Sequence, residues 1–427
     1  MNIRLYLLIL ACIVLYHEDD AASNVGKRYP SEKHFIVDRV TGRPITVLTS
    51  SQFNDSKPYQ TNTTWTADNN WIVFRSNRTG DNEQIFVVNE LTGDIVQLTD
   101  YQDPIGRFCL SRKEMKMFYI RGQQGNQQII ELDIGKLITD SMGDQVKDAS
   151  VYERIVTPLP YDYGQLALDA DETCLYWGGD RSPATTVTQP QAPANRDRKA
   201  YIAYMEKMRV YFEVRGKGPS ELFKINIKTG KIDKLLEVEF KIGHVQTNPW
   251  VPGEVFFCKE TGGDTDQRIW SVRADGTLFR PVYAERPDEW ITHETVTNPD
   301  EMMFIISGHI LLLRDHPGGI AVINLRTDQM KLLGETYEEM PAEGPTIGGF
   351  WHCNGSPDGR WAVGDTHLGN IILLNRTDGQ QILLSTGHPM RPDHAHPIFS
   401  PDSKRILIQS ALLTEGRNLN LMIVNVP

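Results

Sequence analysis

One short pattern returns along the 427 residues of this chain and limits what it can fold into. Each copy has a small polar turn with Pro or Asp, a strand of aromatic and β-branched residues, a second polar turn and a second strand. The turns of the successive copies lie near Ala67, Ser111, Asp169, Pro249, Pro299, Pro357 and Pro401. Seven such units, about 45 to 60 residues apart with one wider gap, predict an all-β, seven-bladed β-propeller.

A pair of β-sandwiches is the alternative fold, but sandwich strands do not normally repeat one motif at blade spacing. We therefore expect residues 23–427 to form a single propeller domain. The wider gap, between Asp180 and Glu221, holds a stretch rich in Pro, Ala, Gln and Thr and then a short candidate helix at 200–209. We expect this insertion to lie near one mouth of the propeller.

The first 22 residues have the pattern of a secretory signal peptide. Arg4 precedes an apolar stretch from Leu5 to Tyr16, and small residues follow at 21–23. The stretch is too short to span a bilayer comfortably, so we expect no stable membrane insertion and a periplasmic or secreted protein. Lipidation at Cys12 is an alternative, although apolar residues continue beyond it.

The charge and the cysteines exclude some classes of protein. A net charge of -11 argues against nucleic acid as a partner, because nucleic-acid binders carry clustered Lys and Arg. The remaining cysteines, Cys109, Cys174, Cys258 and Cys353, are widely spaced and predict buried free thiols. The sequence does not indicate an oligomeric state.

A His-X-His pair near the C-terminus is the strongest indication of chemistry. His394 and His396 are flanked by Pro392 and Pro397, which favour an extended chain, so both imidazoles project to one side. Two imidazoles in that geometry can share one metal ion.

Three further histidines lie just before the turn pattern of a blade, as the pair does: His244, His293 and His352. Equivalent positions of successive blades converge on the central channel of a propeller. We therefore expect four consecutive blades to present imidazoles to one site. Such a site suits manganese, iron, nickel or zinc, and the spacing does not choose among them.

Several of these segments together resemble the oligogalacturonate lyase family. They are 243–250, 260–270, 293–294, 352–359 with 364–365, and 394–402, and the likeness covers most of the chain after residue 22. The resemblance implies a seven-bladed propeller with a divalent metal in its central channel, and Mn²⁺ is the metal that we expect. It also implies a small oligogalacturonide as substrate.

The resemblance assigns roles to individual residues. By motif, His244 looks like the Brønsted base, and His293, His394 and His396 look like metal ligands. The family's fourth ligand is a glutamine three residues before the His-X-His pair, where this chain has Arg391. A guanidinium cannot coordinate a metal. His352, Asp393 or water is therefore expected to take that place.

The family also uses an arginine near the base. Arg215 is our choice, with Arg268 and Arg391 as alternatives, and we expect Arg391, Gln246 and Arg268 to contact substrate. The reaction that the resemblance implies is β-elimination, in which a base removes the C5 proton of a galacturonate ring and the glycosidic oxygen leaves C4. A metal on the neighbouring carboxylate stabilises the charge that develops.

Other functions remain open at this point. Glu294 and Asp393 lie beside the proposed ligands and could form the carboxylate pair of a glycoside hydrolase. A non-catalytic propeller that binds glycan or protein is another alternative, since the periplasmic Tol-system propeller has similar Ser-Pro-Asp-Gly turns. A lyase for a different uronide is a third. The histidine set favours the lyase over the binding propeller, because a scaffold would not need it.

Overall fold

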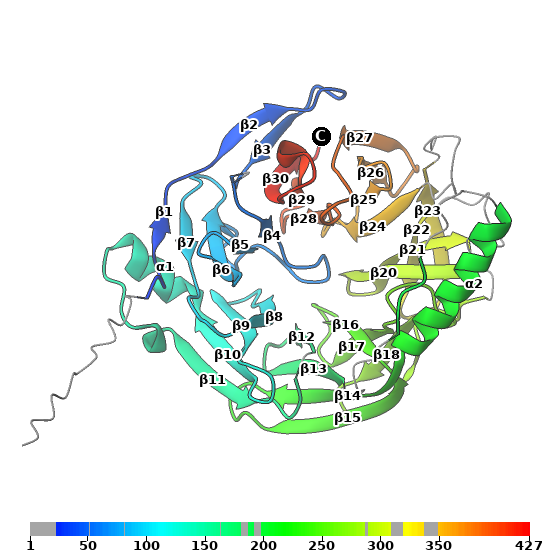
Figure 1. Ribbon diagram of the computed structural model, residues 1–427, viewed down its shortest axis with the longest axis horizontal. Coiled ribbons are helices and arrows are strands. Elements are labelled where there is room, and N and C mark those ends of the chain that lie inside the picture. Colours follow the sequence, from blue (N-terminus) through cyan, green and yellow to red (C-terminus); the bar gives the residue numbers. More distant parts are fainter. Residues whose placement is uncertain are drawn as a thin grey trace, which may run out of the picture.

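Seven antiparallel sheets stand in a ring around a central axis (Figure 1). The structure is a computed structural model, and it describes residues 23–50, 52–80, 82–162, 164–180, 187–191, 198–286, 289–308, 319–336 and 349–427. The predicted seven-bladed β-propeller is confirmed, whereas the expected signal peptide at 1–22 lies outside these residues. Within the described ranges, no helix is long and apolar enough to cross a membrane.

Each sheet is built mainly from strands that follow one another in the chain. The first has β1 (Arg28–Tyr29), β4 (Asp55–Ser56), β5 (Trp71–Ser76), β6 (Gln84–Asn89) and β7 (Ile95–Gln97). The second has β8 (Ile105–Leu110), β9 (Lys116–Arg121), β10 (Gln128–Asp133) and β11 (Glu153–Pro158). The third has β12 (Gln165–Leu168), β13 (Cys174–Asp180), β14 (Lys217–Asn226) and β15 (Ile232–Phe240). The fourth has β16 (Ile242–Thr247), β17 (Glu254–Lys259), β18 (Ile269–Arg273) and β19 (Arg280–Pro281).

The remaining three sheets follow the same plan. The fifth has β20 (Glu289–Asn298), β21 (Glu301–Gly308), β22 (Gly319–Asn324) and β23 (Met330–Glu335). The sixth has β24 (Phe350–Gly355), β25 (Trp361–Thr366), β26 (Ile371–Asn375) and β27 (Gln381–Ser385). The seventh has β28 (Ile398–Phe399), β29 (Arg405–Ser410) and β30 (Asn420–Asn425), joined by β2 (His34–Val37) and β3 (Pro44–Val47).

The seventh sheet closes the ring by combining both ends of the chain. Strand β3 pairs antiparallel with β30, so that Ile45 lies opposite Val424 and Val47 opposite Met422. The inner strands β28 and β29 then complete the same sheet. These pairs tie the N-terminal strands to the last blade, so breaking them would weaken the closure of the ring.

Apolar packing between neighbouring sheets holds the ring together. One buried cluster lies at each of the seven contacts between adjacent sheets. At the closure, Phe74 and Phe86 of the first sheet pack with Leu407 of the seventh. Because each sheet is covered on both faces, its middle strands are nearly continuous apolar runs, such as β6 with five buried residues in succession.

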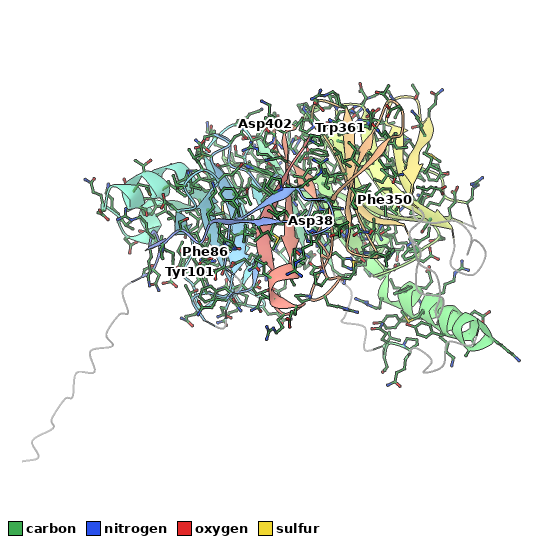
Figure 2. The ribbon with its side chains drawn as sticks, turned by 90° about the horizontal axis from the view of Figure 1, so that it is seen from above. Asp38, Phe86, Tyr101, Phe350, Trp361 and Asp402 are labelled. Carbon is green, nitrogen blue, oxygen red and sulfur yellow. The ribbon has the colours of Figure 1, made fainter. Side chains whose placement is uncertain are left out.

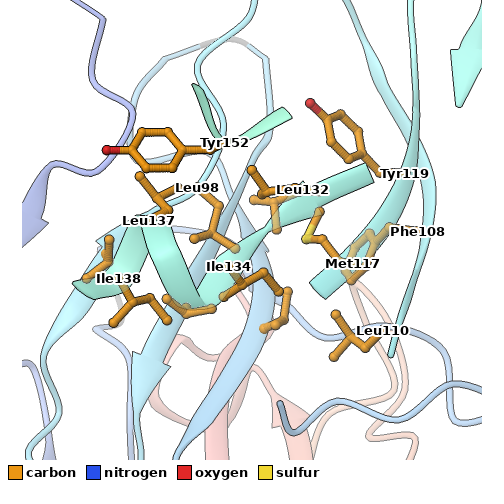
Figure 3. Close-up of a cluster of buried hydrophobic side chains, with 14 of the residues drawn as sticks. Leu98, Phe108, Leu110, Met117, Tyr119, Leu132, Ile134, Leu137, Ile138 and Tyr152 are labelled. Atoms are coloured by element: carbon orange, nitrogen blue, oxygen red, sulfur yellow. The ribbon is translucent and has the colours of Figure 1, made fainter. Parts of the chain in front are cut away.

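Helix α1 (Ile134–Met142) packs over the contact between the first two sheets. It begins after Asp133, whose side chain accepts a hydrogen bond from the Lys136 backbone N–H at 2.8 Å, a favourable N-cap. Its apolar side, with Ile134, Leu137 and Ile138, faces the cluster drawn in Figure 3. The helix therefore seals this part of the core from solvent.

The Ser-Pro-Asp turns connect inner strands to the strands that follow them. In the seventh sheet, the Ser400 hydroxyl donates to Asp402 at 2.6 Å and accepts from the Arg405 backbone N–H at 3.0 Å. Ser356 makes the same contacts with Asp358 and the Trp361 N–H. These bonds fix tight turns, which explains why the pattern marks blade boundaries.

The insertion between β13 and β14 forms helix α2 (Arg198–Arg215), which is longer than the expected 200–209. It stands off one side of the ring (Figures 1 and 2). Tyr204, Met208 and Phe212, each four residues from the next, line the cavity described below. The expected position near a mouth of the propeller is confirmed, and the four cysteines within the described ranges are buried and free, as predicted.

Candidate active site

A cavity of about 490 Å³ lies between α2 and the innermost strands. All five histidines singled out from the sequence line it: His244, His293, His352, His394 and His396. Aromatic side chains form much of the remaining wall, including Tyr59, Trp290, Trp351 and Phe212. The structure therefore brings the predicted histidines together at one site.

Local backbone geometry turns several of these imidazoles into the cavity. His244, His293 and His396 have φ values of +46°, +58° and +46°, in the left-handed region that non-glycine residues seldom occupy. His244 and His293 also sit where the pairing of β16 with β17 and of β20 with β21 shifts register. A bulge redirects a side chain, and strained residues of this kind concentrate at functional sites, at about 1–3 kcal/mol each.

His352 lies in the middle of the imidazole cluster. Its ring centroid is 4.0 Å from that of His293, 3.9 Å from that of His396 and 5.1 Å from that of His394. Only 1% of its surface is exposed. His352 is therefore the central ring of the cluster, and a metal ion shared by the four rings would bind beside it.

Neighbouring oxygen atoms orient these rings. Three imidazoles have Nδ1 next to an oxygen: His293 beside the Tyr59 hydroxyl at 2.8 Å, His352 beside Asp365 at 3.0 Å, and His396 beside Gln60 at 3.0 Å. Such partners fix the tautomer and the orientation of metal-binding histidines. The opposite nitrogen, Nε2, has no hydrogen-bond partner among the described residues on His293, whereas Nε2 of His396 contacts Asp393 Oδ1 at 3.2 Å.

The donor set fits a divalent metal. Among the described residues, His293 Nε2 and His394 Nδ1 are buried and have no hydrogen-bond partner. Burial lowers the pKa values of His293 and His352 well below the ordinary histidine value, and neighbouring imidazoles lower them further. Both rings are therefore neutral at pH 7, the form that binds metals. Ligand atoms of His352, Asp365 and His394 lie within 4.8 Å of one another.

The candidate base lines the same cavity. His244 Nδ1 is 3.1 Å from Glu294 Oε1, and Arg268 Nε donates to Glu294 Oε2 at 3.0 Å. Burial favours the neutral form of Glu294, yet Arg268 and His244 outweigh burial and hold its pKa well below the ordinary value. The ionised carboxylate holds the His244 ring through Nδ1. The other ring nitrogen, Nε2, takes no part in this contact.

A second carboxylate lies near the free nitrogen. Glu260 Oε2 is 3.5 Å from His244 Nε2. Burial raises the pKa of Glu260, but the charges of Arg268 and His244 outweigh it and the net shift is downward. Glu260 is therefore ionised and stabilises positive charge on the His244 ring.

The geometry does not favour a glycoside hydrolase pair. Glu294 is fully buried, is not among the residues that line the cavity, and has both carboxylate oxygens engaged. Asp393 bonds His396 Nε2 at 3.2 Å and accepts from Gln409 at 2.9 Å. A hydrolase acid must be protonated and reach the glycosidic oxygen, and Glu294 does neither.

Two of the expected substrate contacts lie outside the cavity wall. Gln246 is 3% exposed, and its amide bonds the backbone of β20, donating to Glu294 O and accepting from Val296 N at 3.1 Å each. Arg391 is exposed and is absent from the cavity lining within the described ranges. The structure therefore gives no support to direct substrate contact by Gln246. Its side chain instead connects two neighbouring blades through hydrogen bonds.

The other two arginines lie at the site in different ways. Arg268 is buried and lines the cavity, but its Nε donates to Glu294. Arg215 is the exposed last residue of α2, and its guanidinium covers Gly262, where a Cβ would meet Nη1 at 2.8 Å. Since Gly262 lines the cavity, Arg215 lies at the rim.

Sequence reasoning missed the contribution of the first blade. Tyr59 lines the cavity, with its ring centroid 4.8 Å from that of His244 and its hydroxyl on His293. Nearby, Lys57 is buried, and burial lowers its pKa to about 7 although Asp393 and Asp365 oppose the shift. Only their position in the repeat could have indicated these residues. Residues 57–60 precede a blade turn as the histidine segments do, but they contain no histidine.

Together these features define a class of protein. It is a seven-bladed propeller whose central cavity contains a cluster of imidazoles suited to a metal ion and a histidine that contacts a buried carboxylate. No family model matches the chain. The oligogalacturonate lyase of Dickeya dadantii is 25% identical over 211 residues, 44% of this chain and 52% of that protein. The oligogalacturonide lyase of Pectobacterium atrosepticum is 23% identical over 206 residues, with the same shares covered. The chain thus matches about half the length of these curated relatives.

Two solved structures have the same fold. An oligogalacturonate lyase in complex with manganese matches with a TM-score of 0.70 and 22% identity, over 94% of this chain and 98% of that one. The oligogalacturonate lyase from Vibrio parahaemolyticus matches with a TM-score of 0.70 and 20% identity, over 94% and 99%. With the curated relatives, they confirm the resemblance of this chain to the oligogalacturonate lyase family.

Proposed function

We propose that this protein is an oligogalacturonate lyase that cleaves short α-1,4-linked galacturonate oligomers by metal-assisted β-elimination. Digalacturonate and unsaturated digalacturonate from pectin degradation are the substrates in this proposal. The observation that carries it is one cavity shared by His244, bound to a buried carboxylate, and four other imidazoles. The names of the relatives supply the substrate class.

His244 is the base in this reaction. Because Glu294 holds Nδ1 at 3.1 Å, Nε2 is the nitrogen that takes the C5 proton of the galacturonate ring. The electrons of the C5–H bond form the C4–C5 double bond, and the glycosidic oxygen leaves C4 with its electron pair and takes a proton from water. Glu260, 3.5 Å from Nε2, stabilises the imidazolium that results.

The four clustered imidazoles would hold the cofactor: His293, His352, His394 and His396. A divalent cation, Mn²⁺ in this proposal, supplies when bound a Lewis acid that draws charge from the uronate carboxylate. His352 takes the place that Arg391 leaves open in the family's ligand pattern, because its ring lies at the centre of the cluster.

Substrate binding falls to the rim and the aromatic wall. Arg215 can pair with a second uronate carboxylate where α2 ends beside Gly262. Trp290, Trp351 and Phe212 offer apolar faces to the sugar rings. Arg268 is a positioning residue, since it acts on the base through Glu294. A periplasmic or secreted location remains a prediction from residues 1–22.

Cleavage of digalacturonate in water labelled with ¹⁸O tests this function. A lyase yields one product with a C4–C5 double bond and no label from bond cleavage, both detected by mass spectrometry. A hydrolase yields saturated, labelled galacturonate. Intact digalacturonate that co-purifies with the Mn²⁺-treated protein would point to the binding propeller.

A further inference from the structure

A second cavity, of about 300 Å³, lies further along the same innermost strands. Thr297 and Asn354 line it, a few residues beyond His293 and His352 of the first cavity. Among the described residues, none lines both cavities. Because these strands run along the channel, the second cavity lies on the opposite side of the imidazole cluster from α2.

Two buried polar side chains in this lining have atoms that no other described residue satisfies. Gln60 is 2% exposed and Thr297 4% exposed, and neither Gln60 Nε2 nor Thr297 Oγ1 has a hydrogen-bond partner within the described ranges. Buried polar groups in native proteins are nearly always paired, so unpaired ones call for an explanation. A rotation of each side chain toward the cavity would let a ligand with hydroxyl groups satisfy both.

An aromatic side chain and a cation complete the lining. Trp250 is 42% exposed, and the Arg112 guanidinium lies 5.6 Å from the centre of its indole. Both residues line the second cavity. An indole face packs against the apolar face of a sugar ring, and a guanidinium binds a carboxylate in two parallel hydrogen bonds.

We infer that this second cavity binds an acidic monosaccharide. The sugar ring packs on Trp250, its carboxylate pairs with Arg112, and its hydroxyls bond Gln60 and Thr297. The volume is at the lower end for small-molecule sites, which suits one sugar residue rather than an oligomer. The inference rests on this lining alone and does not depend on lyase activity.

Gln60 gives the second cavity a contact with the first. Its Oε1 is 3.0 Å from His396 Nδ1, while its Nε2 is the unpartnered atom. A sugar hydroxyl that accepts from Nε2 would fix this amide and, through it, the His396 ring. A water molecule in the cavity would also satisfy Gln60, so the experiment must distinguish a bound sugar from bound water.

Isothermal titration of the full chain with sodium galacturonate tests the inference. Two control ligands are titrated beside it: galactose, which lacks the carboxylate, and acetate, which lacks the sugar ring. We expect Trp250→Ala and Arg112→Gln each to weaken one galacturonate-binding event about tenfold or more. Galactose and acetate should bind that site about tenfold more weakly or worse. Phe35→Ala and Arg39→Gln, at exposed residues outside the lining, should leave binding unchanged.

Galacturonate binding that is the same in wild type, Trp250→Ala and Arg112→Gln would overturn the inference and leave water as the content of the cavity. The two proposals fail separately. Trp250→Ala should cleave digalacturonate at the wild-type rate, because Trp250 is outside the first cavity. A protein that cleaves nothing but loses galacturonate binding in Trp250→Ala would refute the lyase and support the second site.

Discussion

His244 Nδ1 lies 3.1 Å from Glu294 Oε1, while Arg268 holds the other oxygen of the same carboxylate at 3.0 Å. All three side chains come from neighbouring blades or their connections, β16, β20 and the segment before β18. The buried carboxylate therefore fixes which nitrogen of His244 faces the cavity, and the arginine keeps that carboxylate ionised.

Replacing Glu294 by Gln should lower kcat by about 100-fold to 10,000-fold, because the amide no longer selects the tautomer that accepts the C5 proton. Bound metal should remain near the wild-type level, since Glu294 is not in the imidazole cluster. Steady-state kinetics and metal analysis check both. Glu254→Gln is the matched control, because Glu254 is also buried and ion-paired, to Arg326. Wild-type kcat in Glu294→Gln would exclude this role.

Replacing Tyr59 by Phe should weaken Mn²⁺ binding by about 10-fold to 100-fold. The substitution removes the hydroxyl that lies 2.8 Å from His293 Nδ1 but keeps the ring against His244. Saturating Mn²⁺ should restore most of the activity. Tyr119→Phe, which removes a buried hydroxyl bonded to Glu153, should leave the metal affinity unchanged. An unchanged metal affinity in Tyr59→Phe would show that the hydroxyl does not orient His293.

The identity of the fourth ligand can be tested with two variants. His352→Ala should lose most of the bound Mn²⁺, because His352 is the central ring of the cluster. Arg391→Gln, which restores the family's residue, should change little, since Arg391 is exposed and outside the cavity lining. Equilibrium dialysis with elemental analysis measures both. The opposite pattern, with tighter binding in Arg391→Gln and none lost in His352→Ala, would assign the ligand to position 391.

The pH dependence of stability should include a contribution from His388. This ring is 2% exposed and lies between the hydroxyls of Ser385 and Ser410, each at 2.7 Å. Burial lowers its pKa from 6.5 to about 4, so between these values the unfolded chain binds a proton that the folded protein does not. The unfolding free energy should therefore fall as pH drops from about 6.5 to about 4, by up to about 1.4 kcal/mol per pH unit for this group.

Urea unfolding at a series of pH values measures that slope. His388→Gln should give a shallower fall than wild type over the same interval, because glutamine does not titrate. Equal slopes in the two proteins would mean that His388 takes up its proton in the folded state at an ordinary pH.

The fold could be predicted from the sequence because the repeated turns that indicate it are local features. Each Ser-Pro-Asp turn is closed by its own side chains, as at Ser400 and Asp402, and so it can be recognised without knowing its neighbours. The histidines could be grouped because each precedes such a turn. Closure of the ring by β3 and β30 could not be predicted, since it pairs Ile45 with Val424 from opposite ends of the chain.

The roles of polar neighbours were harder to predict. Asp365 is the last residue but one of strand β25 and reaches His352 on the adjacent strand, a contact that depends on register. Gln246, an expected substrate contact, lies at a bulge of β16, where alternate residues of a strand diverge. Its amide then bonds the neighbouring blade.

The most direct test of the account is the rate at which the Mn²⁺-loaded protein forms unsaturated uronate from digalacturonate, measured beside an EDTA-treated sample and two variants. We expect product from wild type and from His34→Ala, which changes an exposed histidine, and none above background from the EDTA-treated sample or His244→Ala. Product that persists without metal, or in His244→Ala, would contradict a metal-assisted elimination that begins at His244.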